Sequence, residues 1–179
     1  FVKKKIHVIY NPIKDVYYDK NIKKNNQFFY VGRALDPVKR FNLVKESLLK
    51  INDGEKNIKI CGTEDPNFGS YLGVIKDNEL NRMYNSSKYI FLPSKAEGIG
   101  LSMIESMICG SIPITCFDNL TAREFSPEDF ICEPNPNSIV NKIQELERNY
   151  EEKRKIALKF GSKYKVQFDK KSVAKNIIN

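Results

Sequence analysis

The segment YIFLPSKAEGIGLSMIESMICGSIPITC, residues 89–116, decides the fold. It begins and ends with short apolar runs, Tyr89–Leu92 and Ile112–Cys116, which predict two buried strands. Between them, Leu101–Cys109 is predicted to be an apolar helix. Gly110 ends this helix, because glycine readily takes the left-handed conformation that closes one. A strand, a helix and a second strand in this order are typical of a βαβ unit with parallel strands.

The alternation of strands and helices continues on both sides of this unit. We predict further strands at residues 6–10, 27–31, 57–61, 70–72 and 130–132, and a polar loop at residues 15–26. We predict helices, the second capped by Asp77 and the last broken near Gly161, at residues 38–51, 77–86, 137–150 and 151–178. The fold class is therefore α/β: a Rossmann-like, three-layer domain with a mostly parallel sheet of about six strands.

The composition is that of one folded domain, residues 1–179. Of these residues 41% are hydrophobic and 29% are charged, which excludes disordered, collagen-like and coiled-coil chains. No apolar run approaches the roughly 20 residues that a membrane-spanning helix needs. The chain starts without the apolar core of a signal peptide and does not begin with Met, so we expect a piece of a longer protein.

Cysteine and histidine are sparse and do not cluster. The single histidine, His7, lies within an apolar run, so a zinc site and a Ser-His-Asp centre are both disfavoured. No two cysteines have the Cys-x-x-Cys spacing. We therefore expect buried, reduced thiols, as in a cytoplasmic protein, at Cys61, Cys109, Cys116 and Cys132.

The net charge of +8 is concentrated at the two ends of the chain. Residues 1–25 carry +5 and residues 151–179 carry +6, whereas the middle of the chain carries −3. A nucleic-acid-binding protein needs a basic face interleaved with aromatic side chains, which the middle lacks, so we expect no nucleic-acid partner. The Lys-rich ends are either solvated surface or contacts for an anionic membrane or partner, which would make the protein peripheral on the cytoplasmic membrane face.

Several predicted strands end at small or turn-forming residues, namely Gly32, Gly62, Gly73 and Ser94. In open α/β sheets, ligands bind outside the carboxyl ends of the strands, where the strand order reverses. We therefore expect these four strand ends to form the rim of one crevice.

The loop before the helix at residue 101 carries Glu97, Gly98 and Gly100. The glycines allow a ligand to approach the backbone closely, and the first amides of the helix form a site for anions. Glu105, in the second turn, is the only charge of an otherwise apolar helix, so its carboxylate needs a hydrogen-bond partner. That partner is either a ribose diol or a backbone amide or lysine of the fold itself.

Two cations lie on the same predicted rim, within YVGRALDPVKR at residues 30–40. Arg33 follows a glycine that ends a strand, and Lys39 begins a helix. A guanidinium can bind phosphate oxygens through two hydrogen bonds, and an ammonium adds a compact charge. Each cation taken alone could also be solvated surface.

These motifs together resemble the C-terminal domain of retaining glycosyltransferases with the GT-B fold, the glycosyl transferases group 1 family. The resemblance covers nearly the whole chain and is densest over YLGVIKDNELNRMYNSSKYIFLPSKAEGIGLSMIESMICGSIPI, residues 71–114. Seven residues separate Glu97 from Glu105, which is the Glu-x7-Glu spacing of that family. VIYNP, FFYVGRALDPVKR and IKICG, at residues 8–12, 28–40 and 58–62, resemble further family segments.

The resemblance implies one half of a GT-B fold and a role for each site residue. Arg33 and Lys39 would hold the donor diphosphate and Glu97 the hydroxyls of the donor sugar, and these three are the predicted catalytic residues. Glu105 would bind the ribose. The remaining donor-binding positions would be Gly32, the nucleobase segment Gly73, Val74 and Ile75, and the backbone of Gly98, Ile99, Gly100 and Leu101.

One stretch departs from the family. A Gly-Gly pair followed by an acidic residue often comes after the strand that corresponds to Ile112–Cys116. Here the stretch is FDNLTARE, residues 117–124, without glycines, and Glu124 is the candidate for the acidic residue. The residues of this stretch therefore do not indicate how the loop closes on the donor.

The implied function is the transfer of a sugar from a nucleoside diphosphate sugar to an acceptor, with retention. Because the chain has no Asp-x-Asp cluster, we predict metal-independent transfer without a cofactor. The acceptor-binding N-terminal domain would lie outside this chain, so we expect the domain alone to bind donor weakly without turnover. The alternatives are a nucleotide-sugar epimerase of GT-B fold, a non-catalytic nucleotide-sugar-binding module and a nucleic-acid binder.

Overall fold

The computed structural model describes residues 9–25 and 28–178. Its centre is a single six-stranded sheet with the order β3-β2-β1-β4-β5-β6, in which every pairing is parallel. The strands are β1 (Phe28–Val31), β2 (Ile58–Cys61), β3 (Ser70–Tyr71), β4 (Tyr89–Leu92), β5 (Ile112–Cys116) and β6 (Ile131–Cys132). The predicted α/β class and the six-stranded parallel sheet are confirmed.

The middle strands are apolar because the sheet is covered on both faces. All residues of β4 and β5 are buried. Within the sheet, Phe91 of β4 aligns with Tyr30 of β1 on one side and with Ile114 of β5 on the other. Parallel strands that are buried on both faces show continuous apolar runs rather than alternation, which is why these segments could be recognised in the sequence.

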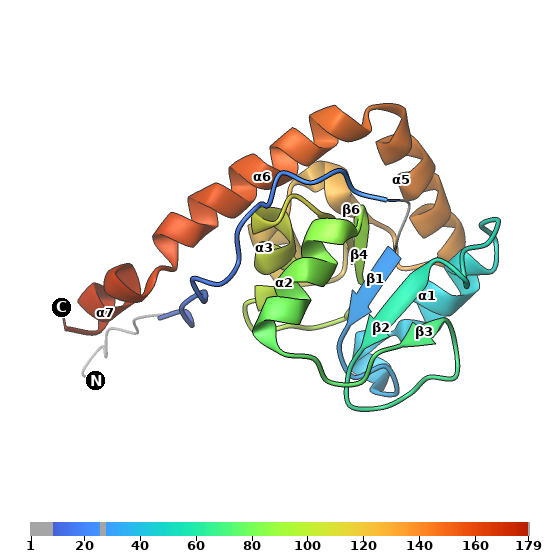
Figure 1. Ribbon diagram of the computed structural model, residues 1–179, viewed down its shortest axis with the longest axis horizontal. Coiled ribbons are helices and arrows are strands. Elements are labelled where there is room, and N and C mark those ends of the chain that lie inside the picture. The colour runs from blue at the N-terminus through green and yellow to red at the C-terminus, as the bar shows by residue number, and fades with distance from the viewer. Residues whose placement is uncertain (1–8, 26–27, 179) are drawn as a thin grey trace, which may run out of the picture.

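Helices flank the sheet on both sides, giving three layers (Figure 1). Helices α1 and α5 pack against each other, while α3 packs against α2 and α6. The helices are α1 (Phe41–Leu48), α2 (Asp77–Ser86), α3 (Leu101–Ile108), α4 (Leu120–Phe125), α5 (Pro136–Arg148), α6 (Tyr150–Gln167) and α7 (Lys170–Ile178), with 3-10 turns η1 (Pro37–Lys39) and η2 (Glu128–Phe130). The four cysteines are free and buried, as predicted.

The amino-terminal segment differs from the prediction. The expected strand at residues 6–10 lies largely outside the described residues, as does His7, and residues 9 and 10 belong to no strand. Residues 9–25 instead run as an extended strap between α2 and α6 (Figure 1). The predicted loop over residues 15–26 is thus confirmed for its described part.

Lys24 anchors the strap, although the sequence suggested a solvated lysine. Its side chain is buried, and its Nζ donates to the carbonyl oxygens of Tyr84, Asn85 and Cys109 at 2.9–3.0 Å. These carbonyls end α2 and α3, where unpaired acceptors and the helix dipole favour a cation. Burial, together with the charge of Arg154, lowers the pKa of Lys24 to about 7. The strap therefore ties the ends of two helices together.

The helix predicted at residues 77–86 has these bounds in the structure, but its predicted cap is wrong, and so is the predicted break near Gly161. Asp77 is the first residue of α2 and not its cap, and its carboxylate pairs with Lys14 of the strap at 2.8 Å. The predicted break near Gly161 is absent, since α6 continues to Gln167. A Cβ at Gly161 would lie 2.4 Å from the backbone nitrogen of Ile108. This glycine therefore permits close packing of α6 on α3 and does not mark a bend.

We expect Gly161→Ala to destabilise the protein, although alanine is the better helix former. The added methyl group would overlap the α3 backbone, and such overpacking costs about 1–3 kcal/mol. Urea unfolding measures the change in the free energy of unfolding. Ser162→Ala, at the next and exposed position of the same helix, is the control and should be neutral or slightly stabilising. Equal stability of the two variants would contradict the packing role.

Candidate functional site

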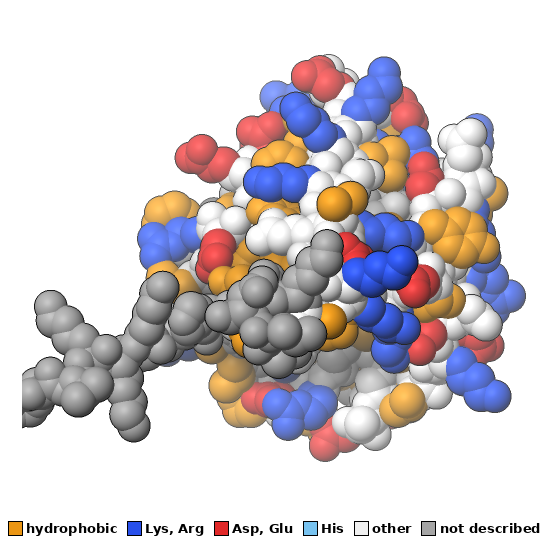
Figure 2. All heavy atoms as spheres, turned by 90° about the vertical axis from the view of Figure 1, so that its left-hand side faces the viewer, with side chains coloured by type: hydrophobic (Ala, Val, Ile, Leu, Met, Phe, Trp, Pro, Cys, Tyr) orange, Lys and Arg blue, Asp and Glu red, His pale blue; other side chains and the backbone are white. Residues whose placement is uncertain are grey.

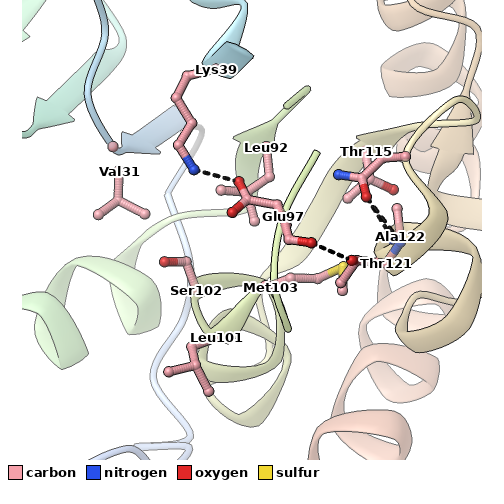
Figure 3. Close-up of a pocket in the computed structure, with 13 residues that line it drawn as sticks. Val31, Lys39, Leu92, Glu97, Leu101, Ser102, Met103, Thr115, Thr121 and Ala122 are labelled. Carbon is pink, nitrogen blue, oxygen red and sulfur yellow. Dashed lines mark hydrogen bonds and ion pairs between the residues drawn. The ribbon is translucent and has the colours of Figure 1, made fainter. Parts of the chain in front are cut away.

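A pocket of about 140 Å³ lies at the carboxyl ends of β1, β4 and β5 (Figure 3). This is the edge where the order of the strands reverses, because β1 pairs with β2 on one side and β4 on the other. The pocket is lined by Val31, Gly32, Lys39, Leu92, Glu97, Gly100, Leu101, Ser102, Met103, Thr115, Asn119, Thr121 and Ala122. Of the four strand ends predicted to form the rim of one crevice, only Gly32 lines this pocket, whereas Gly62, Gly73 and Ser94 do not.

Lys39 and Glu97 face each other across the pocket. Lys39 Nζ lies 2.7 Å from Glu97 Oε1, and the two side chains are 21% and 24% exposed (Figure 3). Lys39 ends the η1 turn, which Asp36 caps by accepting a hydrogen bond from the backbone nitrogen of Val38 at 2.9 Å. The cap fixes the turn, so it also fixes where the ammonium group enters the pocket.

The start of α3 forms another wall. Its N-cap is Gly100, which has φ +66° and lines the pocket. No side chain of the described residues caps this helix, so its first amides remain available to a ligand. A Cβ at Gly100 would lie 3.4 Å from Thr121 Cγ2 and would also strain the backbone. The helix start has the features of an anion site.

Arg33 does not line this pocket. Its side chain is 65% exposed, and its Nη2 pairs with Asp36 Oδ2 at 2.6 Å. Because Arg33 directly follows Gly32, its backbone is on the pocket rim while its guanidinium points away. Thus the structure brings Lys39, Glu97, Gly32, Gly100 and Leu101 together but leaves Arg33 outside.

The other predicted donor-binding residues lie around the pocket. Gly98 faces open space, since a Cβ there would meet nothing within 4 Å, and Ile99 is buried. Gly73, Val74 and Ile75 follow β3 and do not line the pocket; Val74 is 75% exposed. They follow the edge strand β3, which is separated from β1 by β2.

Glu105 lies behind the pocket wall and is 8% exposed. Its Oε2 accepts a hydrogen bond from the Tyr84 hydroxyl at 3.3 Å, so its recorded partner is neither a backbone amide nor a lysine. Burial raises the pKa of this carboxyl to about 7, against the opposing effects of the Tyr84 hydrogen bond and the Lys14 charge. Ser102, three residues earlier on the same helix, lines the pocket.

Among the pocket residues missed in the sequence, Asn119 and Thr121 lie at the start of α4, a short helix that was not predicted. Asn119 caps α4 and also donates from Nδ2 to the carbonyl of Ser94 at 2.9 Å. Thr121 Oγ1 donates to the carbonyl of Glu97 at 2.8 Å. The cap residue at position 119 was a local signal, but a six-residue helix shows too little periodicity to be recognised.

The loop that departs from the family is tied to the loop that carries Glu97. Asn119 and Thr121 hold the Glu97 loop from the side, without a Gly-Gly pair. The candidate acidic residue, Glu124, faces away, since its Oε1 accepts a hydrogen bond from Tyr10 at 3.0 Å. Glu124 does not line the pocket.

Within residues 9–25 and 28–178, no group of three or more His, Cys, Asp or Glu side chains is arranged to hold a metal ion. Over the same residues, none of the helices combines the length and the apolar character that crossing a bilayer requires.

The structure is a Rossmann-like domain with a pocket at the carboxyl edge of its sheet. The model of the family "Glycosyl transferases group 1" matches residues 18–161, and the chain belongs to this family. The family inferred from the motifs is confirmed. Over 52 residues, 29% of this chain and 13% of the relative, the sequence is 38% identical to O-antigen chain mannosyltransferase B of Escherichia coli.

Solved structures share the fold. Sucrose-phosphate synthase of Thermosynechococcus elongatus superposes with a TM-score of 0.80 at 18% identity, over 96% of this chain and 50% of that chain. S. aureus TarM, solved with UDP among its ligands, superposes with a TM-score of 0.73 at 21% identity, over 100% and 40%. Anabaena HepE, solved with UDP-glucose, gives 0.70 at 16% identity, over 86% and 48%. The chain thus spans half or less of the length of these three proteins.

Protonation of Glu105 should make stability depend on pH. In the folded state its pKa is raised from 4.5 to about 7, so the folded protein binds a proton between these values that the unfolded chain has lost. This group therefore lowers the free energy of unfolding as the pH rises from about 4.5 to about 7, by on the order of 3 kcal/mol. We expect Glu105→Gln, which keeps an acceptor for Tyr84, to gain stability relative to the wild type at pH 8 but not at pH 4.5.

Urea unfolding at the two pH values measures this difference. Glu79→Gln, at an exposed position of α2, is the control and should change stability equally at both. A Glu105→Gln effect that is independent of pH would contradict the buried, proton-binding carboxyl.

Proposed function

We propose that this chain is the donor-binding domain of a glycosyltransferase that transfers a sugar from a nucleoside diphosphate sugar to an acceptor. The observation that carries the proposal is the pairing of Lys39 with Glu97 beside the uncapped start of α3. An ammonium group and free helix amides suit a diphosphate, and a carboxylate suits sugar hydroxyls. Family membership supports the same activity.

In this proposal, the leaving group is the nucleoside diphosphate, which gains negative charge as the bond to the sugar breaks. Lys39 and the amides at the start of α3 stabilise that charge where it develops. Arg33, on the pocket rim, leaves Asp36 and binds the phosphates instead. A metal ion is then not required, and no cofactor takes part. Retention of configuration, with the acceptor proton passing to the leaving phosphate, follows from the resemblance to the family.

Glu97 and Glu105 have different roles in the proposal. Glu97 leaves Lys39 on donor binding and accepts hydrogen bonds from the sugar hydroxyls. Glu105 lies one helical turn from Ser102 on the same face of α3, so its carboxylate can bind the ribose from behind the pocket wall. The segment from Gly73 to Ile75 would contact the nucleobase.

The whole protein is proposed to contain an acceptor-binding domain outside this chain, because this chain spans only half or less of the three solved relatives compared above. Transfer would then require both domains, and this domain alone would bind donor weakly. UDP-sugars are the first donors to test, since TarM and HepE were solved with UDP and UDP-glucose. Free, buried thiols favour a reducing compartment such as the cytoplasm.

Titration calorimetry with UDP-, GDP- and ADP-sugars tests the donor site directly. We expect one of them to bind, and Lys39→Met to weaken it about ten- to a hundredfold, since a hydrogen bond to a charged group contributes roughly 1.5–3 kcal/mol. Lys50→Met, an exposed position beyond the far end of α1, is the control and should bind as the wild type does. Absence of binding to every donor by folded protein would overturn the proposal.

Glu97→Gln gives a second test, because the substitution should change the affinities for two ligands differently. The substitution removes the carboxylate that competes for Lys39, so the nucleoside diphosphate alone should bind more tightly. The nucleotide sugar should gain less or bind more weakly, because its hydroxyls lose a charged acceptor. Calorimetry with UDP and UDP-glucose compares the two, or with the matching pair if another base is preferred. Equal changes in affinity for both ligands would show that Glu97 does not take part in sugar recognition.

We also propose that the carboxyl-terminal helices contact an anionic membrane surface. Lys155, Lys159 and Lys163 are exposed at four-residue spacing along α6. On the face drawn in Figure 2, acidic side chains lie between basic ones. The proposal therefore rests on the row of three lysines along α6 and not on a uniformly basic face. The protein should then sediment together with vesicles that contain 30% phosphatidylglycerol in low salt, and high salt should release it. Replacement of the three lysines by glutamine should abolish the effect, whereas unchanged sedimentation would contradict the proposal.

A further inference from the structure

Three loops at the carboxyl edge of the sheet make the walls of the pocket. The β1 loop (residues 32–40) carries Lys39, the β4 loop (residues 93–100) carries Glu97, and the β5 loop (residues 117–119) leads into α4. Catalysis or donor binding at this pocket requires a fixed spacing between the three loops, because their side chains come from separate strands.

Loops on neighbouring strands are tied directly. The backbone nitrogen of Lys95 donates to the carbonyl of Val38 at 2.9 Å, which joins the β4 and β1 loops. The Asn119 amide donates to the carbonyl of Ser94 at 2.9 Å, which joins the β5 and β4 loops. Neither of these two contacts joins the β1 and β5 loops to each other.

One ion pair joins the β1 and β5 loops directly. Arg40 Nη1 and Nη2 donate to Asp118 Oδ1 and Oδ2 at 2.9 and 2.6 Å. The strands before these two residues are separated by β4, so the pair spans about two strand spacings, or roughly 10 Å of sheet width. Exposed ion pairs contribute little to stability as a rule, but two parallel hydrogen bonds between a guanidinium and a carboxylate are the exception in geometry.

The backbone of Arg40 is also unusual. Its φ and ψ angles are 51° and 42°, the left-handed region that side chains other than Gly, Asn and Asp seldom adopt. This residue directly follows Lys39 and is the N-cap of α1, without any side-chain cap hydrogen bond. Strain of this kind persists where surrounding contacts impose it. The Asp118 contact is the one recorded for this side chain within the described residues.

We propose that Arg40 and Asp118 are positioning residues, which hold the wall that carries Lys39 at a fixed distance from the wall formed by the β5 loop and α4. The proposal rests on the proposed function, because it concerns donor binding at the same pocket. Neither residue lines the pocket, so they act through Lys39 and Thr121 and do not contact the donor. The hydrogen bonds from Arg40 also lower the pKa of Asp118, which keeps the pair ionic near neutral pH.

The competing interpretation is that Arg40 binds phosphate itself and that Asp118 merely occupies it in the free protein. The two interpretations predict opposite results for Asp118→Asn. If the pair positions the walls, its loss weakens donor binding. If Arg40 is a ligand held by Asp118, its release strengthens binding of a diphosphate.

Calorimetry on the full-length protein with UDP, GDP and ADP, and with the matching glucose donor, distinguishes them. We expect Asp118→Asn to weaken both the diphosphate and the nucleotide sugar by about five- to tenfold, as expected for coupled neighbours. Glu147→Gln is the matched control, because Glu147 pairs with Lys88 at 3.0 Å between elements at the opposite edge of the sheet. It should lose a comparable ion pair without any change in affinity.

The exchanged pair, Arg40→Asp with Asp118→Arg, separates positioning from folding. Asp tolerates the left-handed conformation better than Arg does, so the reversed pair is compatible with the backbone. Each single substitution should weaken donor binding, and the double variant should restore most of it at an unchanged melting temperature. Tighter binding by Asp118→Asn, or no recovery in a double variant as stable as the wild type, would overturn the proposal.

Failure of the proposed function gives a different result. In that case the wild-type protein itself binds none of the three diphosphates or donors. Binding by the wild type together with unchanged affinity in Asp118→Asn would instead refute only the positioning role.

Discussion

The position of β4 between β1 and β5 is the constraint on which the rest of the molecule depends. All four residues of β4 are buried, and the strand pairs in parallel with both neighbours. Because parallel strands end at the same edge, three loops that are far apart in the chain meet there. The loops then need only a few polar contacts to form a pocket, since burial of the apolar strands has already brought them together.

Helix α3 depends on the same packing. Gly161 lets α6 approach its backbone, and Lys24 binds the carbonyl group of Cys109 at its far end. The start of the helix is left without a side-chain cap at the pocket. The fold thus satisfies the carboxyl end of α3 internally and leaves its amino end available, which is the polarity that an anionic ligand requires.

Cations at the pocket rim are paired with carboxylates of the protein itself. Lys39 pairs with Glu97, Arg33 with Asp36 and Arg40 with Asp118. In the proposed function, a diphosphate exchanges places with a carboxylate to reach Lys39 or Arg33, so its affinity would be the difference between two interactions rather than the sum of new ones. Under the same proposal, the exchange would favour a complete nucleotide sugar, which offers hydroxyl groups to the displaced Glu97.

The sequence by itself determined the parallel sheet, the helix at residues 101–108 and the residues Lys39, Glu97 and Gly100 of the pocket. Continuous apolar runs and glycines at strand ends are local signals, and they sufficed for these features. Only the tertiary structure decided that Arg33 points away from the pocket, that Glu105 meets Tyr84, and that Asn119 and Thr121 belong to the site. The physical reason is that a side chain's direction and partner depend on residues far away in the chain, whereas strand and helix patterns repeat over a few residues.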